Sequence, residues 1–214
     1  MTPPALPRPP FHFPPVNKHR LAVGTVLHRT HARALRSGEF NPCLGQPTRF
    51  APFQDAAGAC VPTLYAATTR EAACFETIFH DIEANAAFKT VRLDQVEARS
   101  VSRIAPRRDL SLAGLFTPDL KAWGLQRRDL IDTPKSTYAQ TVSWAVAIHA
   151  THADIDGLIW TSRQCDPEQG IVLYGDRVTE AEIETIERLE AASNAALLLE
   201  LRAFGRRAGI DIVS

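Results

Sequence analysis

Single polar side chains stand within or beside short apolar runs over the first three quarters of this 214-residue chain. The residues concerned are Arg29, Arg49, Tyr65, Glu76 and Ser162. A charge among apolar residues costs free energy unless it is paired or used, because burial removes its hydration. The pattern therefore favours a fold that delivers these side chains to ion pairs or to a functional site.

Length and composition indicate one globular domain. The chain is 45% apolar with no formal net charge, and its 214 residues suffice for one well-buried core but not for two full domains. An isoelectric point near 7.1 gives no basic surface for phosphates at the level of the whole chain. We therefore expect no direct nucleic-acid binding.

The four cysteines, Cys43, Cys60, Cys74 and Cys165, are widely separated, without a C-x-x-C pair or paired histidines. This spacing suggests neither a zinc site nor a disulfide framework, so we expect reduced thiols and no bound metal. The chain has no long apolar run that could span a membrane, and its first residues lack the apolar core of a secretory signal. It is expected to be soluble and cytoplasmic, without membrane contact.

Proline dominates the N-terminus, where it occupies seven of the first fifteen positions. Proline removes a backbone donor and fixes φ, so residues 1–20 are predicted to form an extended or disordered arm. Such an arm is most often a simple tail, although it could also lie across a partner. Residues 21–214 then form the folded domain.

Strands and loops are predicted directly after the arm. Residues 21–29 read as a strand that ends by delivering Arg29, and a polar stretch with Gly, Pro and Asn follows. Residues 48–50 and 64–67 are further short strand candidates.

A helix over residues 69–82 is the most secure local prediction. Thr68 and Glu71 have the spacing of a capping box, and apolar residues then recur at helical intervals. Glu76 falls at the border of the apolar face, where a carboxylate can point into a cleft.

The second half of the chain alternates strands with helices. Strands are predicted at residues 88–93, 158–160 and 170–175, and a helix begins near Ser136 or Thr137 and runs to His149. The strand at 158–160 leads directly to Ser162. Residues 164–169 are predicted to form a loop, and residues 103–132 a long loop to which we assign no role.

The order of Arg29, Arg49, Tyr65, Glu76 and Ser162, with a helix beneath Glu76, resembles the RES domain, a family named for its Arg, Glu and Ser. The likeness spans residues 29–177. Members of that family act as toxins of bacterial toxin–antitoxin pairs and consume NAD+. The resemblance implies a single α/β (mixed α+β) domain with a central mixed sheet related to the ADP-ribosyltransferase fold. It also implies a hetero-oligomer with an Xre-like antitoxin, which would supply DNA binding.

The resemblance also bears on the C-terminal tail. Thr179 and Glu182 give a second capping-box spacing, so local rules favour a helix there. The family pattern favours a strand before Ser193 instead. A helix then follows as far as Gly205, with a last strand at residues 209–213.

The resemblance implies a chemistry in which NAD+ is a substrate and no cofactor is bound. Cleavage of the nicotinamide–ribose bond creates a cationic sugar, and the nicotinamide leaves as a neutral ring without needing an acid. Glu76, Arg29 and Ser162 would carry the catalysis, with Glu76 stabilising the sugar. Each could instead have an ordinary structural role: Glu76 as a solvated glutamate on a helix, Arg29 in an ion pair, and Ser162 as a loop residue.

Substrate binding would fall to residues around these three. Arg49 offers a planar fork for the diphosphate, and Tyr65 an aromatic face against nicotinamide. His28, Tyr138 and Arg163 are further candidates. An ion pair for Arg49 and a core position for Tyr65 remain the alternatives. His149 and His152 lie near a helix end and are expected to be structural or exposed to solvent.

Other functional classes have less support. The chain lacks the G-x-S-x-G elbow, the G-x-G-x-x-G fingerprint and the P-loop. A non-catalytic module that binds a nucleotide or a protein in the same cleft is the main alternative, and an enzyme acting on another nucleotide-sugar is a third. The sequence does not decide whether water, phosphate or a protein side chain would accept the ADP-ribose.

Overall fold

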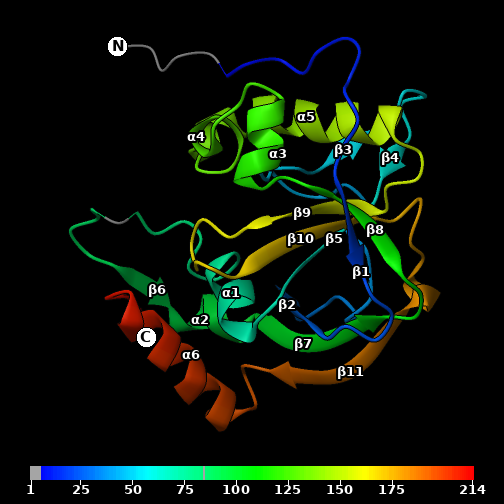
Figure 1. Ribbon diagram of the computed structural model, residues 1–214. Coiled ribbons are helices and arrows are strands. Elements are labelled where there is room, and N and C mark those ends of the chain that lie inside the picture. Colours follow the sequence, from blue (N-terminus) through cyan, green and yellow to red (C-terminus); the bar gives the residue numbers. More distant parts are fainter. Residues whose placement is uncertain (1–5, 84) are drawn as a thin grey trace.

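An eight-stranded mixed sheet organises the computed structural model, which describes residues 6–83 and 85–214 (Figure 1). The strand order is β1-β8-β9-β10-β5-β2-β7-β11. Neighbouring strands are antiparallel except β8 and β9, which are parallel. The predicted class, a mixed α/β domain with a central mixed sheet, is confirmed.

The strands of this sheet are β1 (Lys18–Leu21), β2 (Leu27–Ala32), β5 (Thr63–Ala67), β7 (Arg99–Pro106), β8 (Leu110–Gly114), β9 (Gly157–Thr161), β10 (Gln169–Tyr174) and β11 (Ile183–Glu190). Two small ribbons pair β3 (Phe53–Gln54) with β4 (Cys60–Val61) and β6 (Thr90–Arg92) with β12 (Asp211–Val213). The helices are α1 (Arg70–Phe75), α2 (Leu93–Glu97), α3 (Thr117–Ala122), α4 (Arg127–Leu130), α5 (Tyr138–Thr151) and α6 (Ala195–Arg207), with short 3-10 turns η1 (Lys135–Thr137) and η2 (Glu180–Glu182).

Apolar side chains on both faces of the sheet build the core. Successive residues of a strand point to opposite faces, so Leu158 and Trp160 of β9 pack towards α5 while Ile159 packs into the opposite cluster. Figure 1 shows α3, α4 and α5 over the first face. A third apolar cluster joins α1 to α6 at the other end of the molecule.

The sheet opens between β2 and β5. These two strands share one paired position, His28 with Ala67, whereas β2 pairs with β7 from Leu27 to Ala32. Beyond that position the two strands separate, and α1 follows β5 directly after its N-cap, Thr69. The seam is therefore lined by side chains of both strands and of the turn that follows α1.

Two local predictions in the first half are wrong in their bounds. The expected strand over 21–29 is split into β1 and β2 by a turn at Gly24, whose φ is +76°. The expected helix over 69–82 ends at Phe75. The carbonyl of Cys74 accepts hydrogen bonds from the amides of Thr77, Ile78 and Phe79, so the regular helical ladder ends in a series of turns. Phe79, which follows these turns, is packed in the core.

Two further predictions from local pattern are wrong. Residues 48–50 form a loop instead of a strand, with Thr48 Oγ1 donating to the carbonyl of Ala51 at 2.8 Å. Residues 103–132 are not one long loop, since they contain the end of β7, all of β8, α3 and α4. The turn at residues 107–109 is the only polar break between β7 and β8.

The predictions for the rest of the chain are confirmed in type. The strand at 64–67 is β5, the strand at 88–93 is the shorter β6, and 158–160 and 170–175 are the paired β9 and β10. The helix expected to begin near Ser136 or Thr137 is α5. In the tail, Thr179 and Glu182 form a capping box around η2 only, and β11 follows as the family pattern implied.

The described part of the N-terminal arm lies along α5. Trp144 Nε1 donates to the carbonyl of Pro7 at 3.0 Å, and Phe13 is buried against Trp123 and Trp144. The arm then enters the sheet as β1. Residues 1–5 lie outside the described part.

A disulfide joins Cys43 to Cys60, which contradicts the expectation of four reduced cysteines. The loop after β2 folds back over the β3–β4 ribbon and brings the two Cα atoms to 6.1 Å, within disulfide range. Linear spacing gives no sign of this contact. Cys74 and Cys165 are free and buried. None of the helices in the described residues combines the length and the apolar character needed to cross a membrane.

The disulfide predicts a thiol count. Protein unfolded without reductant should react with two equivalents of maleimide, at Cys74 and Cys165, and with four after reduction, as counted by intact mass. Because the bridge closes a sequence separation of 17 residues, reduction should also lower the free energy of unfolding by about 3 kcal/mol. Four reactive thiols before reduction would contradict the bridge.

Candidate active site

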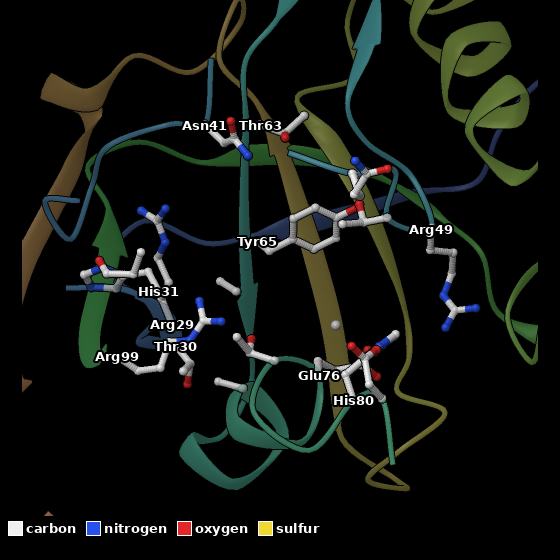
Figure 2. Close-up of a pocket in the computed structure, with 18 of the residues that line it drawn as sticks. Arg29, Thr30, His31, Asn41, Arg49, Thr63, Tyr65, Glu76, His80 and Arg99 are labelled. Carbon is white, nitrogen blue, oxygen red and sulfur yellow. The ribbon is translucent and has the colours of Figure 1, made fainter. Parts of the chain in front are cut away.

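A cavity of about 440 Å³ lies at the seam between β2 and β5. This volume is within the usual range for small-molecule sites. Five of the eight predicted site residues line it: Arg29, Arg49, Tyr65, Glu76 and Tyr138. Figure 2 shows Arg29 on one side, Arg49 and Glu76 on the other, and Tyr65 between them.

Arg29 projects from β2 and is almost fully buried, with 4% of its surface exposed. Its Nη1 donates to the carbonyl of Ser37 at 2.7 Å. Among the described residues no carboxylate lies within 4 Å of its guanidinium, so the structural ion pair considered above is not formed. Burial lowers the pKa of Arg29 to about 10, which leaves the group charged at neutral pH.

His31 stands two residues beyond Arg29 on the same strand and also lines the cavity. Its Nε2 shares a hydrogen bond of 2.9 Å with Ser102 Oγ, which in turn donates to Ser37 Oγ at 3.0 Å. Burial, reinforced by the charge of Arg29, lowers the pKa of His31 to about 4. A neutral polar network therefore lies beneath the Arg29 guanidinium.

Arg49 reaches the cavity from the loop before Phe50. Its Nη1 donates to the carbonyl of Ile131 and, at 3.2 Å, to Thr133 Oγ1. Its Nη2 is buried without a hydrogen-bond partner in the described part of the chain. The guanidinium carbon lies 5.4 Å from the ring centroid of Tyr138, a cation–π distance. Burial lowers the pKa of Arg49, and its Nη2 is a buried donor that no described residue satisfies.

Tyr65 contributes a ring face rather than a free hydroxyl. Its oxygen accepts from the amide of Phe50 at 3.1 Å and bonds Thr48 Oγ1 at 2.9 Å, so the phenol holds the loop that carries Arg49. Burial raises the pKa of Tyr65 to about 12, which keeps it neutral. Trp160 continues the aromatic wall, and Gly170 lies so close to its indole that a Cβ would be 2.6 Å from the ring.

Glu76 is the C-cap of α1, a rigid mount at the base of the cavity. Its Oε1 accepts a hydrogen bond of 2.5 Å from Ser162 Oγ. Ser162 is fully buried, and its oxygen accepts from the amides of Gln164 and Cys165 at 3.1 and 3.0 Å. The two amides leave the hydroxyl proton directed at the carboxylate, so Ser162 positions Glu76 and does not itself line the cavity.

His28 and Arg163 lie outside the cavity. His28 is adjacent to Arg29 in β2 and therefore points to the opposite face, where burial and the charge of Arg70 lower its pKa. Arg163 is exposed and donates to the carbonyl of Thr133, the residue whose hydroxyl also bonds Arg49.

Several lining residues were not identified from the sequence. They include His31, Asn41, Thr63, His80, Asp81, Arg99 and Lys135. His31 follows Arg29 with the period of a strand, and His80 follows Glu76 with the period of a helix, so both spacings were available signals. The others come from separate loops and strands that only the fold brings together.

The cavity thus combines cationic donors, an aromatic wall and one oriented carboxylate. Two buried guanidinium groups suit an anionic group such as a phosphate. The carboxylate suits a cationic centre or a hydroxyl donor. In the part of the chain that the structure describes, no group of three or more His, Cys, Asp and Glu side chains is arranged to hold a metal ion.

The low pKa of His31 predicts an acid-sensitive fold. Unfolded His31 takes up a proton below about pH 6.5, whereas folded His31 does so only near pH 4. The contribution of neutral His31 to the free energy of unfolding is therefore complete above pH 6.5. It is lost as the pH falls towards 4, by up to about 3 kcal/mol. Denaturant unfolding of wild type and His31→Gln at pH 7 and pH 5 should show a smaller loss in the variant.

The exposed His12 on the arm provides the matched control. His12→Gln should lose as much stability as wild type between the two pH values. An equal loss in His31→Gln and wild type would show that His31 is not the group responsible.

Comparison with known proteins identifies one matching family. The model of the RES domain family matches residues 23–192, which is most of the chain. A search of curated proteins finds no match. Because this match covers most of its length, the chain belongs to the RES domain family.

Proposed function

We propose that this protein is the toxin of a bacterial toxin–antitoxin pair and that it consumes NAD+ by cleaving the nicotinamide–ribose bond. The observation that carries the proposal is the convergence of Arg29, Arg49 and Glu76 on one cavity of about 440 Å³. These residues are remote in the chain, and the cost of burying two unpaired guanidinium groups is offset when an anionic ligand occupies the site.

Different residues of the pocket would contact different parts of the dinucleotide. Arg29 and the free Nη2 of Arg49 are donors for the diphosphate, and the rings of Tyr65 and Trp160 are surfaces for a planar base. Glu76 would then face the ribose and stabilise the positive charge that develops as nicotinamide leaves. Because Ser162 fixes one carboxylate oxygen, this charge is oriented before the substrate binds.

The same first step serves three acceptors. Water would make the protein an NAD+ glycohydrolase, phosphate a phosphorylase, and a protein side chain an ADP-ribosyltransferase. We propose an Xre-like antitoxin as the partner that inhibits the site in a hetero-oligomer, and the cytoplasm, where NAD+ is available, as the place of action.

Glu76→Gln should abolish most turnover while leaving the fold intact. The amide keeps the shape of the side chain but removes its charge, so nicotinamide release from NAD+ should fall by about 100-fold or more. Ser162→Ala keeps the charge and loses its orientation, and a smaller fall of about tenfold is expected. Nicotinamide and the ADP-ribose product are measured by mass spectrometry, with and without phosphate and cell lysate.

Glu184→Gln on β11 is the matched control, since it removes the same charge from an exposed strand away from the cavity. It should retain wild-type activity. Should wild type bind NAD+ in calorimetry yet release no nicotinamide and modify no protein, the site would be a binding module instead. Unchanged growth and cellular NAD+ on induction would argue against the toxin assignment.

A further inference from the structure

A chain of polar side chains borders the cavity on the side of Glu76. His80 Nδ1 lies 2.8 Å from Asp81 Oδ1, and His80 Nε2 lies 3.0 Å from the hydroxyl of Tyr138. Lys135 forms an ion pair with Asp81. All four residues line the cavity, and Figure 2 shows His80 beside Glu76, across from Arg29.

The partners of His80 assign its proton. A carboxylate only accepts hydrogen bonds, so a neutral His80 carries its hydrogen on Nδ1, facing Asp81. The lone pair on Nε2 then accepts the hydroxyl proton of Tyr138. Burial raises the pKa of Asp81, but hydrogen bonds from His80 and Lys135 outweigh it and lower the pKa overall, which keeps the carboxylate charged.

Tyr138, which is hydrogen-bonded to His80, also contacts Arg49. The Tyr138 ring is almost fully buried, and the Arg49 guanidinium carbon lies 5.4 Å from its centroid. Arg49 has one nitrogen bonded to backbone and side-chain oxygens and one nitrogen free. A shift of the Tyr138 ring would therefore change its contact with the Arg49 guanidinium, which we assign to the dinucleotide.

Resting on the proposed function, we infer that His80 is a positioning residue for substrate binding: its Nε2 accepts the hydrogen bond of the Tyr138 hydroxyl and so holds the ring against Arg49. A side chain without an acceptor at position 80 would leave the phenol proton of Tyr138 without this partner. The ring would then have to shift to find another.

The charged and titratable groups around the His80–Tyr138 pair come from each element packed against it. Asp81 and Glu76 lie on its own segment, Lys135 and Tyr138 come from η1 and α5, Arg49 from the loop before Phe50, and Arg163 from the loop after β9. The Gln164 amide donates to the His80 carbonyl at 3.2 Å and carries no charge. Among the charged side chains that the structure describes, only Asp81 forms a hydrogen bond with the imidazole.

His80→Gln keeps the hydrogen-bond polarity of the imidazole, because a glutamine presents an amide oxygen to Tyr138 and an NH₂ to Asp81. It should keep a KM for NAD+ near that of wild type. His80→Leu removes both groups and should raise KM about tenfold, with kcat changed less than KM.

Tyr138→Phe completes the cycle, because without the hydroxyl the acceptor at position 80 should no longer matter. Its KM should be raised, and adding His80→Leu should change it little. A KM in His80→Gln as high as that of His80→Leu would overturn the inference. A wild-type KM in His80→Leu would overturn it as well.

One readout does not depend on turnover. In protein labelled with ¹⁵N-histidine, the His80 resonances, assigned by their loss in His80→Gln, should show the Nδ1–H tautomer at neutral pH, and Tyr138→Phe should shift Nε2. An Nε2–H tautomer would refute the assignment even if NAD+ is consumed. If wild type releases no nicotinamide, the proposed function fails, and the same variants are compared by their Kd for NAD+ in calorimetry. An unaltered Kd in His80→Leu, or no binding by wild type, would then refute the role of His80 also.

Discussion

The separation of β2 from β5 after one paired position is the constraint on which the site depends. A continuous ladder at this point would pair the backbone groups of both strands and close the space between them. With pairing limited to His28 and Ala67, Arg29 and His31 on one strand face Thr63 and Tyr65 on the other across a cavity. The six-position ladder between β2 and β7 keeps Arg29 in register, although β5 does not pair with Arg29 on the other side of β2.

Rigid attachments at every wall reduce the freedom of the groups that line this cavity. Glu76 is fixed by the cap of α1 and by Ser162, which itself accepts two backbone amides. The loop that bears Arg49 is held by the Tyr65 hydroxyl and by the Cys43–Cys60 bridge. A site whose donors are oriented before the ligand arrives loses less entropy on binding and can direct charge at a transition state.

The sequence predicted the elements whose signal is local and missed those set by contacts. β5, α5, β9 and β10 carry their own apolar pattern and were found, whereas α1 stops at Phe75 because Phe79 is drawn into the core. Five predicted residues meet in the cavity, yet Ser162 acts through Glu76, and His28 faces away because it is one residue from Arg29 on a strand. No local sequence pattern indicates the Cys43–Cys60 contact or the position of Arg49 on a loop. Both arise from the way the chain folds. The relation to the ADP-ribosyltransferase fold stays a prediction.

The distribution of charge explains why two arginines and a carboxylate share one cavity without neutralising each other. Arg29 is hydrogen-bonded to the Ser37 carbonyl and lies near His31, which burial keeps neutral. Glu76 is hydrogen-bonded to the neutral hydroxyl of Ser162. Each charged group therefore has neutral hydrogen-bond partners in place of a counter-ion. These partners orient the group without neutralising its charge. In a partly desolvated cavity such fields act over longer distances than in water. An ion pair between Arg29 and Glu76 would leave neither group available to the substrate that we propose, which is anionic at its diphosphate and becomes cationic at the ribose.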